Sequence, residues 1–228
     1  APSDSLRVTP PLSWFTAAGT TGSMRVDVLA TDSTGRTASA NFTLVMPDLS
    51  VSASPATLYT KNDVTITLGN RMDQSVTLVL RYQQTELYRT TLTAYQKSIT
   101  AKESWFTEAS VSGNTMQVTA AVSDGLGRSA STTFTVIKPT ASTATPTEPV
   151  SVTKDGEQQI TFKWTYSGNG TQTKAQLQWK TASGDWTSLG TVNGAGTSYS
   201  AAAYKFPQGS VNWRVRVTNS FGLTGSWS

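Results

Sequence analysis

Carboxylates are the side chains of this sequence with the most obvious potential for chemistry, because the 228-residue chain contains no Cys and no His. Thiolate nucleophiles, imidazole bases and Cys/His metal sites are therefore excluded. Two close acidic pairs remain, Asp155 with Glu157 and Glu103 with Glu108. A carboxylate pair can supply a general acid and a general base. These pairs fall in a predicted turn and beside a predicted helix start, where solvated negative charge is ordinary. We predict a non-enzyme with no catalytic residue, metal site or cofactor.

A glycine-rich stretch, "VSDGLGRSAS" (122–131), has the composition of a phosphate-binding loop. Such a loop needs a following helix and usually a Lys beside the last glycine, and neither is present. Similar stretches occur as "ATDSTGRTAS" (30–39) and "VTNSFGLTGS" (217–226). In each, an Asp or Asn can accept bonds from the following amides, and Gly three positions later can adopt the left-handed conformation. The three stretches are predicted to be β-hairpin turns.

The turns belong to a longer internal repeat. Residues 13–47 match residues 104–139 along their whole length with one inserted residue. The sequence before the second copy has no full counterpart before the first, so residues 1–47 are expected to be half of a repeat. The apolar side chains of this half would be exposed in isolation. We therefore expect neighbouring domains or other subunits to complete it. The apolar set is Met24, Val26, Val28, Phe42 and Leu44.

Alternating apolar residues predict a β-sandwich for the second repeat. Trp105 in "SWFTE" (104–108) is expected to close the end of the sandwich from a helical turn capped by Ser104. Trp14 is expected to do the same in the first repeat. The predicted strands are 49–54, 63–69, 75–82, 86–92, 98–100, 115–123 and 128–137. The predicted core faces are Val64, Ile66 and Leu68; Val76, Leu78 and Leu80; and Phe134 and Val136.

A Pro- and Thr-rich stretch (138–150) is expected to form an extended linker to a third domain. In that domain, alternation places Trp213, Val215 and Val217 inward, so that Arg214 and Arg216 point outward. The neighbouring strand would present a polar row on the same side. We predict a ligand-binding face for an anionic glycan or other anionic polymer, with Trp186 at its border as a stacking platform. An ordinary solvated sheet face is the alternative. The predicted binding residues are Gln176, Gln178, Lys180, Trp186, Arg214 and Arg216.

Trp227 has two possible placements. In "GSWS" it resembles the cytokine-receptor motif in which an indole stacks on outward-facing arginines. Counting pairs through a three-residue hairpin loop instead places Trp227 opposite Val215, pointing inward. The inward placement is the prediction.

Charge and hydropathy limit the partners. The net charge is +4, and residues 140–228 carry seven basic and four acidic groups, or +3. This excess is small for a nucleic-acid-binding protein. No apolar run approaches the length of about 20 residues that a membrane helix needs. We expect neither a nucleic-acid nor a membrane partner.

Two segments of the last domain resemble a known family. "FPQGSVNWRVRVTNSFG" (206–222) is similar to the penultimate strand and hairpin of a fibronectin type III domain, with Trp213 where the family usually has Tyr. "ITFKWTYSG" (160–168) resembles its tryptophan-bearing second strand. Residues 1–139 resemble the immunoglobulin-like repeats of tailed-phage structural proteins and bacterial surface proteins.

The resemblance implies an all-β chain of tandem β-sandwiches. Its parts are the C-terminal half of an immunoglobulin-like repeat (1–47), a complete repeat (48–139), and a fibronectin type III-like domain lacking most of its last strand (140–228). It implies a structural stalk or spacer and adhesion module of a phage tail or fibre, located at the virion surface. The alternatives are a cell-surface adhesin, or the accessory spacer or carbohydrate-binding region of an extracellular glycan-degrading enzyme.

Overall fold

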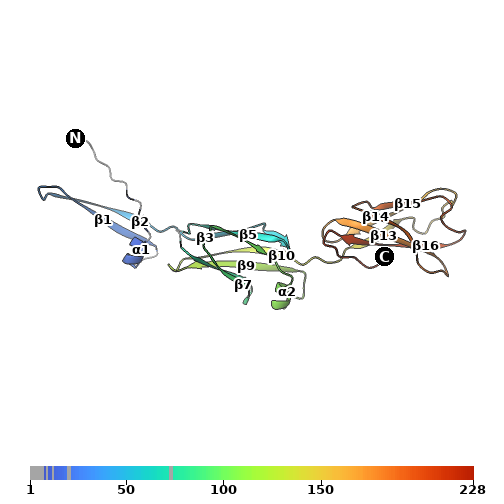
Figure 1. The fold of residues 1–228 in the computed structure, drawn as a ribbon, viewed down its shortest axis with the longest axis horizontal. Helices are drawn as coiled ribbons and strands as arrows, with labels where there is room; N and C mark the ends of the chain where they lie inside the picture. The colour runs from blue at the N-terminus through green and yellow to red at the C-terminus, as the bar shows by residue number, and fades with distance from the viewer. Residues whose placement is uncertain (1–7, 9, 12, 20–21, 72–73) are drawn as a thin grey trace, which may run out of the picture. The chain divides into compact units, whose positions relative to one another are not determined.

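The computed structural model describes residues 8, 10, 11, 13–19, 22–71 and 74–228. It divides into two compact units, Ala1–Lys138 and Pro139–Ser228. Nearly all regular structure is β-strand, as the alternating pattern predicts (Figure 1). None of the helices within the described residues is both long enough and apolar enough to cross a membrane.

Residues 48–138 of unit 1 form a two-sheet sandwich. One sheet has the order β3-β5-β8 and the other has the order β4-β10-β9-β6-β7. All pairs are antiparallel except β10 with β4. The strands are β3 (Ser50–Ser54), β4 (Thr57–Tyr59), β5 (Asp63–Gly69), β6 (Val76–Tyr82), β7 (Thr85–Leu92), β8 (Gln96–Thr100), β9 (Thr115–Asp124) and β10 (Ser129–Ile137).

The core of this sandwich lies between the two sheets and uses every residue predicted for it. Strand β5 alternates between buried and half-buried positions, with Val64 and Ile66 completely buried. The other predicted core residues are at most 3% exposed: Leu68, Val76, Leu78, Leu80, Phe134 and Val136. The period-two pattern therefore identified the buried faces correctly.

Strand β4 was not predicted from the sequence. The first extended segment of this sandwich contributes a strand to each sheet. Its first part, β3, pairs with β5; after Pro55 the chain crosses to the other sheet, where β4 pairs with β10. Proline has no backbone N–H to donate to a sheet, which makes it suited to the crossing point.

Helix α2 (Ser104–Glu108) closes one end of the sandwich, as predicted, and buries Trp105 and Phe106. The predicted capping role of Ser104 is wrong. The cap position is Glu103, which makes no side-chain capping bond. The burial of two aromatic side chains holds this short helix in place instead.

The first repeat contributes helix α1 (Ser13–Ala18) and the hairpin of β1 (Ser23–Thr31) and β2 (Thr37–Val45). Phe15 is buried, whereas Trp14 is only half-buried. The two strands form a sheet of their own. The side chains that were expected to be left uncovered are half-buried or exposed in the hairpin.

Unit 2 is a second sandwich, with sheets of order β11-β12-β15 and β14-β13-β16. Residues 143–148 are not a linker as predicted, because they form β11 and pair with β12. The Pro- and Thr-rich composition is compatible with this edge position, since Pro is tolerated at sheet edges. The strands are β11 (Thr143–Glu148), β12 (Ile160–Ser167), β13 (Gln172–Thr181), β14 (Thr187–Asn193), β15 (Ser198–Ala201) and β16 (Val211–Asn219).

Aromatic side chains fill the core of unit 2. Phe162 packs edge-to-face on Trp213 at 5.1 Å between ring centroids, and on Phe206 at 5.7 Å. The indole N–H of Trp164 donates to Gln172 Oε1 at 2.9 Å, so this buried polar group is satisfied. Trp213 donates its indole N–H to the carbonyl of Pro149 at 2.8 Å.

All three glycine-rich stretches are hairpin turns, as predicted. Asp32 Oδ1 accepts from the amides of residues 34 and 36, and Asp124 Oδ1 from those of residues 126 and 128. Asn219 Oδ1 accepts in the same way from residues 221 and 223. The conserved spacing puts Gly35, Gly127 and Gly222 at φ angles between 79° and 82°. Glycine adopts this left-handed conformation without steric cost.

Candidate functional site

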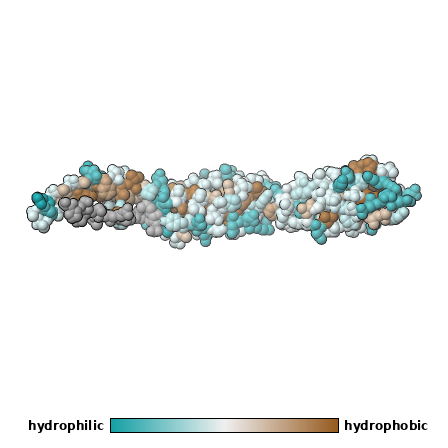
Figure 2. All heavy atoms as spheres, turned by 90° about the horizontal axis from the view of Figure 1, so that it is seen from above, coloured by the Kyte–Doolittle hydropathy of each residue, from teal (hydrophilic) through white to brown (hydrophobic). Residues whose placement is uncertain are grey.

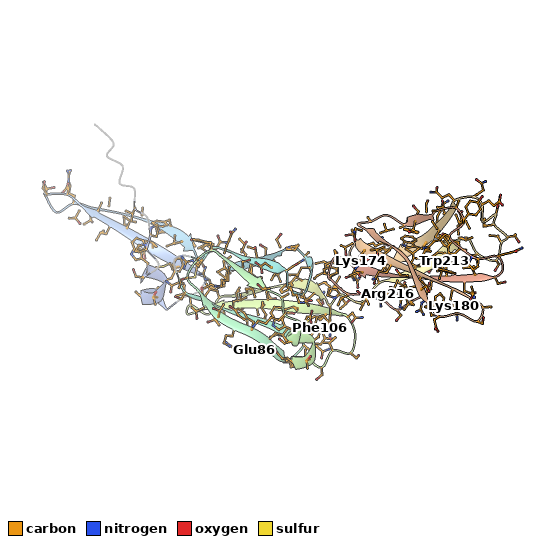
Figure 3. The ribbon with its side chains drawn as sticks, turned by 45° about the vertical axis from the view of Figure 1, so that its right-hand side comes forward. Glu86, Phe106, Lys174, Lys180, Trp213 and Arg216 are labelled. Carbon is orange, nitrogen blue, oxygen red and sulfur yellow. The ribbon has the colours of Figure 1, made fainter. Side chains whose placement is uncertain are left out.

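The predicted binding residues lie on the outer face of the β14-β13-β16 sheet. Ala175, Leu177, Val215 and Val217 are buried on its inner face, so the residues between them point outward. The strand register places Gln176 opposite Arg216 and Gln178 opposite Arg214. Figure 3 labels Lys174, Lys180 and Arg216 on this unit. We call this outer surface the basic face, defined by Lys174, Gln176, Gln178, Lys180, Trp186, Arg214, Arg216 and Trp227.

Hydrogen bonds across the two strands hold both arginines of the basic face. Arg214 donates through Nε and Nη2 to Gln178 Oε1, at 3.0 and 2.7 Å. Arg216 donates through Nε to Gln176 Oε1 at 2.9 Å. Each guanidinium has five N–H donors, so these bonds fix the side chain while leaving other donors on each arginine.

The arginines also stack on two tryptophans. The guanidinium carbon of Arg214 is 4.0 Å from the ring centroid of Trp186 and 4.7 Å from that of Trp227. The guanidinium carbon of Arg216 is 4.5 Å from the ring centroid of Trp227. The Lys180 ammonium is 5.1 Å from the Trp186 ring. These distances are within the range of cation–π attraction. We call Trp186, Arg214, Trp227 and Arg216 the arginine–tryptophan ladder.

The predicted inward placement of Trp227 is wrong, and a bulge explains why. The amide of Gly225 donates to the carbonyl of Val217, and the amide of Ser228 donates to that of Val215. The step from Gly225 to Ser228 spans three residues, whereas the step from Val217 to Val215 on the opposite strand spans two. The extra residue reverses the alternation of side chains. Ser228 takes the position opposite Val215, and Trp227 joins the outer face.

Trp186, the predicted platform for a ligand, lies within cation–π distance of Arg214 and Lys180, so it contributes to holding these cations. The sequence prediction thus found six residues that the structure brings together, but it omitted Lys174 and misplaced Trp227. The "GSWS" motif was the signal for Trp227, and the alternation of β13 was the signal for Lys174.

The charge of the basic face is not balanced by ion pairs. Within residues 139–228, the ion pair that forms is Lys163 with Glu148, at 3.0 Å, and neither residue belongs to the face. Lys174, Lys180, Arg214 and Arg216 thus present four positive charges beside tryptophan and glutamine side chains. Such an array can attract anionic groups and offer them N–H donors.

Three of the four residues in the predicted acidic pairs take part in local contacts. Asp155 Oδ1 accepts from the amide of Glu157 at 2.9 Å in an exposed turn, and Glu103 lies 3.4 Å from the Lys61 ammonium. In the described part of the chain, no three or more His, Cys, Asp or Glu side chains gather as metal ligands would.

Strand order and packing define the fold class of this protein: it is all-β, with one β-sandwich in residues 48–138 and a second in unit 2. No protein-family model matches the sequence, and no curated protein matches it.

Several solved structures are similar to the chain. One contains fibronectin type III-like modules of Clostridium thermocellum CbhA, with 16% identity and a TM-score of 0.33, covering 78% of this chain and 90% of that one. A second contains the FN1–FN3 domains of chicken CNTN1, with 16% identity and a TM-score of 0.31, covering 90% and 75%. A third is a tetra-tandem repeat from the extending region of a large adhesion protein, with 17% identity and a TM-score of 0.35, covering 89% and 54%.

Proposed function

We propose that the chain is a non-catalytic spacer and adhesion segment of a tailed-phage tail or fibre protein, located at the virion surface. Its sandwiches are the scaffold, and the basic face of unit 2 is the adhesive surface. The observation that carries the adhesive part is the array of Lys174, Lys180, Arg214 and Arg216 without acidic partners in unit 2. The resemblance of residues 1–139 to phage and bacterial surface repeats supports the structural part.

The proposed ligand is a cell-surface polymer with repeating negative charges, such as a teichoic acid or an acidic polysaccharide. Arg214 and Arg216 are held by glutamines and indoles, so they lose little side-chain freedom on binding. Their remaining N–H groups suit phosphate or carboxylate oxygens. Lys174 and Lys180 extend the positive charge along β13. Duplex DNA is expected to bind more weakly, because the charged area is short.

A binding experiment tests the adhesive role. We expect the 228-residue chain to bind immobilised poly(glycerol phosphate) and polygalacturonate, but not dextran. This binding should weaken as the salt concentration rises. The double substitution Lys174→Gln/Lys180→Gln should weaken binding about tenfold or more, because each cation near an anionic surface contributes about 1 kcal/mol.

The matched control is Lys154→Gln/Lys205→Gln, which removes the same charge from loops outside the sheet. Equal losses for both pairs would contradict a localised adhesive face. No binding to either anionic polymer would contradict the adhesive function itself.

Immunogold labelling tests the location. Antibodies raised against the chain should label the tails of intact phage particles. Labelling confined to bacterial cell walls would favour the alternative of a surface adhesin. Recovery of the chain in a secreted polypeptide that hydrolyses glycans would favour the accessory region of an enzyme.

A further inference from the structure

The β1–β2 hairpin is a structural copy of the β9–β10 hairpin. Met24 pairs with Leu44 and Val26 with Phe42, just as Met116 pairs with Val136 and Val118 with Phe134. Each copy is preceded by a short helix with the sequence SWFT. The two hairpins therefore present apolar side chains of similar type in the same register.

Their surroundings differ. Phe42 is 45% exposed, whereas its counterpart Phe134 is 2% exposed. Val28 is 47% exposed, whereas Ala120 is completely buried. In Figure 2 the residues of this part of unit 1 form a hydrophobic area at the surface. Within the described residues, the hairpin has the core face of a sandwich, and no further strand pairs with it.

The second repeat shows what covers such a face. Strand β6 pairs with the outer edge of β9, and β4 pairs with the outer edge of β10. The β3-β5-β8 sheet supplies the opposing half of the core. The corresponding edges of β1 and β2 pair with no other strand within the described residues.

Each hairpin turn also carries an arginine, Arg36 in the first and Arg128 in the second. Arg128 is bound to Asp124 and donates through Nη1 to the carbonyls of Pro47 at 2.8 Å and Asn70 at 3.0 Å. These carbonyls lie in the segment entering the sandwich and in the loop between β5 and β6. Arg36 makes the same bond to Asp32, at 2.7 Å, but its side chain is 84% exposed. The first turn therefore holds a guanidinium in position without the carbonyls that its counterpart binds.

The chain order indicates where the missing strands connect. Val8 stands five positions before the SWFT sequence, as Ile99 of β8 does in the second repeat. Val8 is 53% exposed and Ile99 is 6% exposed. The position that Ile99 fills in a complete sandwich is thus occupied by a residue of the same type.

We propose that β1 and β2 belong to a sandwich whose other strands have the pattern of residues 48–100. These strands connect to the N-terminal side of α1 in the same polypeptide. Arg36 donates hydrogen bonds to the segment by which the chain enters this sandwich. The partner is identified by its chemistry. It has alternating apolar strands for the exposed face, a free strand for each hairpin edge, and backbone carbonyls for the arginine.

An extended chain tests this proposal, with residues 48–98 placed directly before Val8. In the 228-residue chain we expect a monomer in which the amides of the outer edge of β1 exchange rapidly with deuterium. In the extended chain those amides should exchange about 100-fold more slowly. The same extended chain carrying Phe42→Ser should lose this protection.

Two results would overturn the proposal. One is an extended chain in which residues 48–138 remain protected while β1 exchanges as before. The other is a 228-residue chain that dimerises and already protects β1, because a second copy would then cover the face.

Matched arginine variants test the polar contact. Arg36→Gln should lower the unfolding temperature of the added sandwich in the extended chain by more than it lowers the unfolding temperature of the 228-residue chain, where only the exposed bond to Asp32 is lost. Arg128→Gln should lower the unfolding temperature of the 48–138 sandwich in both chains. An equal effect of Arg36→Gln in the two chains would contradict the proposed bond to the entering segment.

Discussion

At the scale of single residues, one local solution recurs three times. A side-chain oxygen at the start of the turn accepts hydrogen bonds from two backbone amides, and a glycine three residues later has a positive φ. The glycine-rich composition that resembled a ligand loop is thus explained by backbone geometry. The surroundings then differentiate the copies, because Asp124 and Arg128 form a buried ion pair and Asp32 and Arg36 an exposed one.

The first turn predicts a measurable pKa. The Thr34 hydroxyl, followed by the amide and side chain of Arg36, lowers the pKa of Asp32 from 3.8 to about 2. Because the folded-state pKa is lowered, the contribution of this carboxylate to stability is present above pH 4 and is lost as the pH falls towards 2. Thr34→Val should raise the pKa of Asp32 towards 3.8 in a carbon-detected NMR titration. Ser33→Ala is the control, and an unchanged pKa in Thr34→Val would contradict the assignment.

The arginine–tryptophan ladder also predicts an effect on stability. Replacing Arg214 and Arg216 with Ser removes three ring contacts and the bonds to Gln176 and Gln178. Cation–π contacts at exposed sites contribute about 0.5–1 kcal/mol each. For a domain of this size the unfolding temperature of unit 2 should fall by several degrees. Calorimetry of the full chain measures it, with Lys174→Ser as the control. An unchanged temperature would show that the ladder is not stabilising.

At the scale of elements, hydrophobic alternation accounts for most of what the sequence could predict. It located β5, β6, β9 and β10 closely because each has one face in a core and one towards solvent. It missed β4 and β11, which lie at sheet edges beside prolines and bury few side chains. It also misplaced Trp227, because a bulge depends on backbone pairing that the residue pattern does not encode.

Asn219 links the last turn to the start of unit 2, and its loss should destabilise the whole sandwich. Its Oδ1 accepts two turn amides, and its Nδ2 donates to the Thr140 carbonyl at 2.9 Å and to the Ser142 hydroxyl at 3.3 Å. The residue is 1% exposed. Asn219→Ala should lower the free energy of unfolding of unit 2 by about 1–3 kcal/mol, because buried polar groups lose their partners. Urea unfolding measures this change.

The exposed Asn212 of the same strand provides the comparison for that measurement. Asn212→Ala should leave the stability of unit 2 close to that of the unsubstituted chain. A similar loss in both variants would mean that the strand, and not the buried bonds of Asn219, determines the effect.

At the scale of the whole molecule, the sequence repeat corresponds to a shared hairpin register, and within the described residues β1 and β2 pair only with each other. Most of the candidate site could also be predicted, because outward residues on adjacent strands must lie side by side. The stacking of Trp186 and Trp227 on the arginines could not, since it depends on a loop and a bulge. These features combine a scaffold of sandwiches with one basic surface on unit 2.

The central claim is that this surface binds anionic polymers, and NMR mapping tests it most directly. Soluble poly(glycerol phosphate) is added to the isotope-labelled 228-residue chain while amide, indole and arginine Nε–H signals are followed. We predict shifts concentrated at the Nε–H groups of Arg214 and Arg216, the indoles of Trp186 and Trp227, and the amides of β13 and β16. Shifts centred elsewhere on the chain, or no shifts at saturating polymer and low salt, would contradict the account.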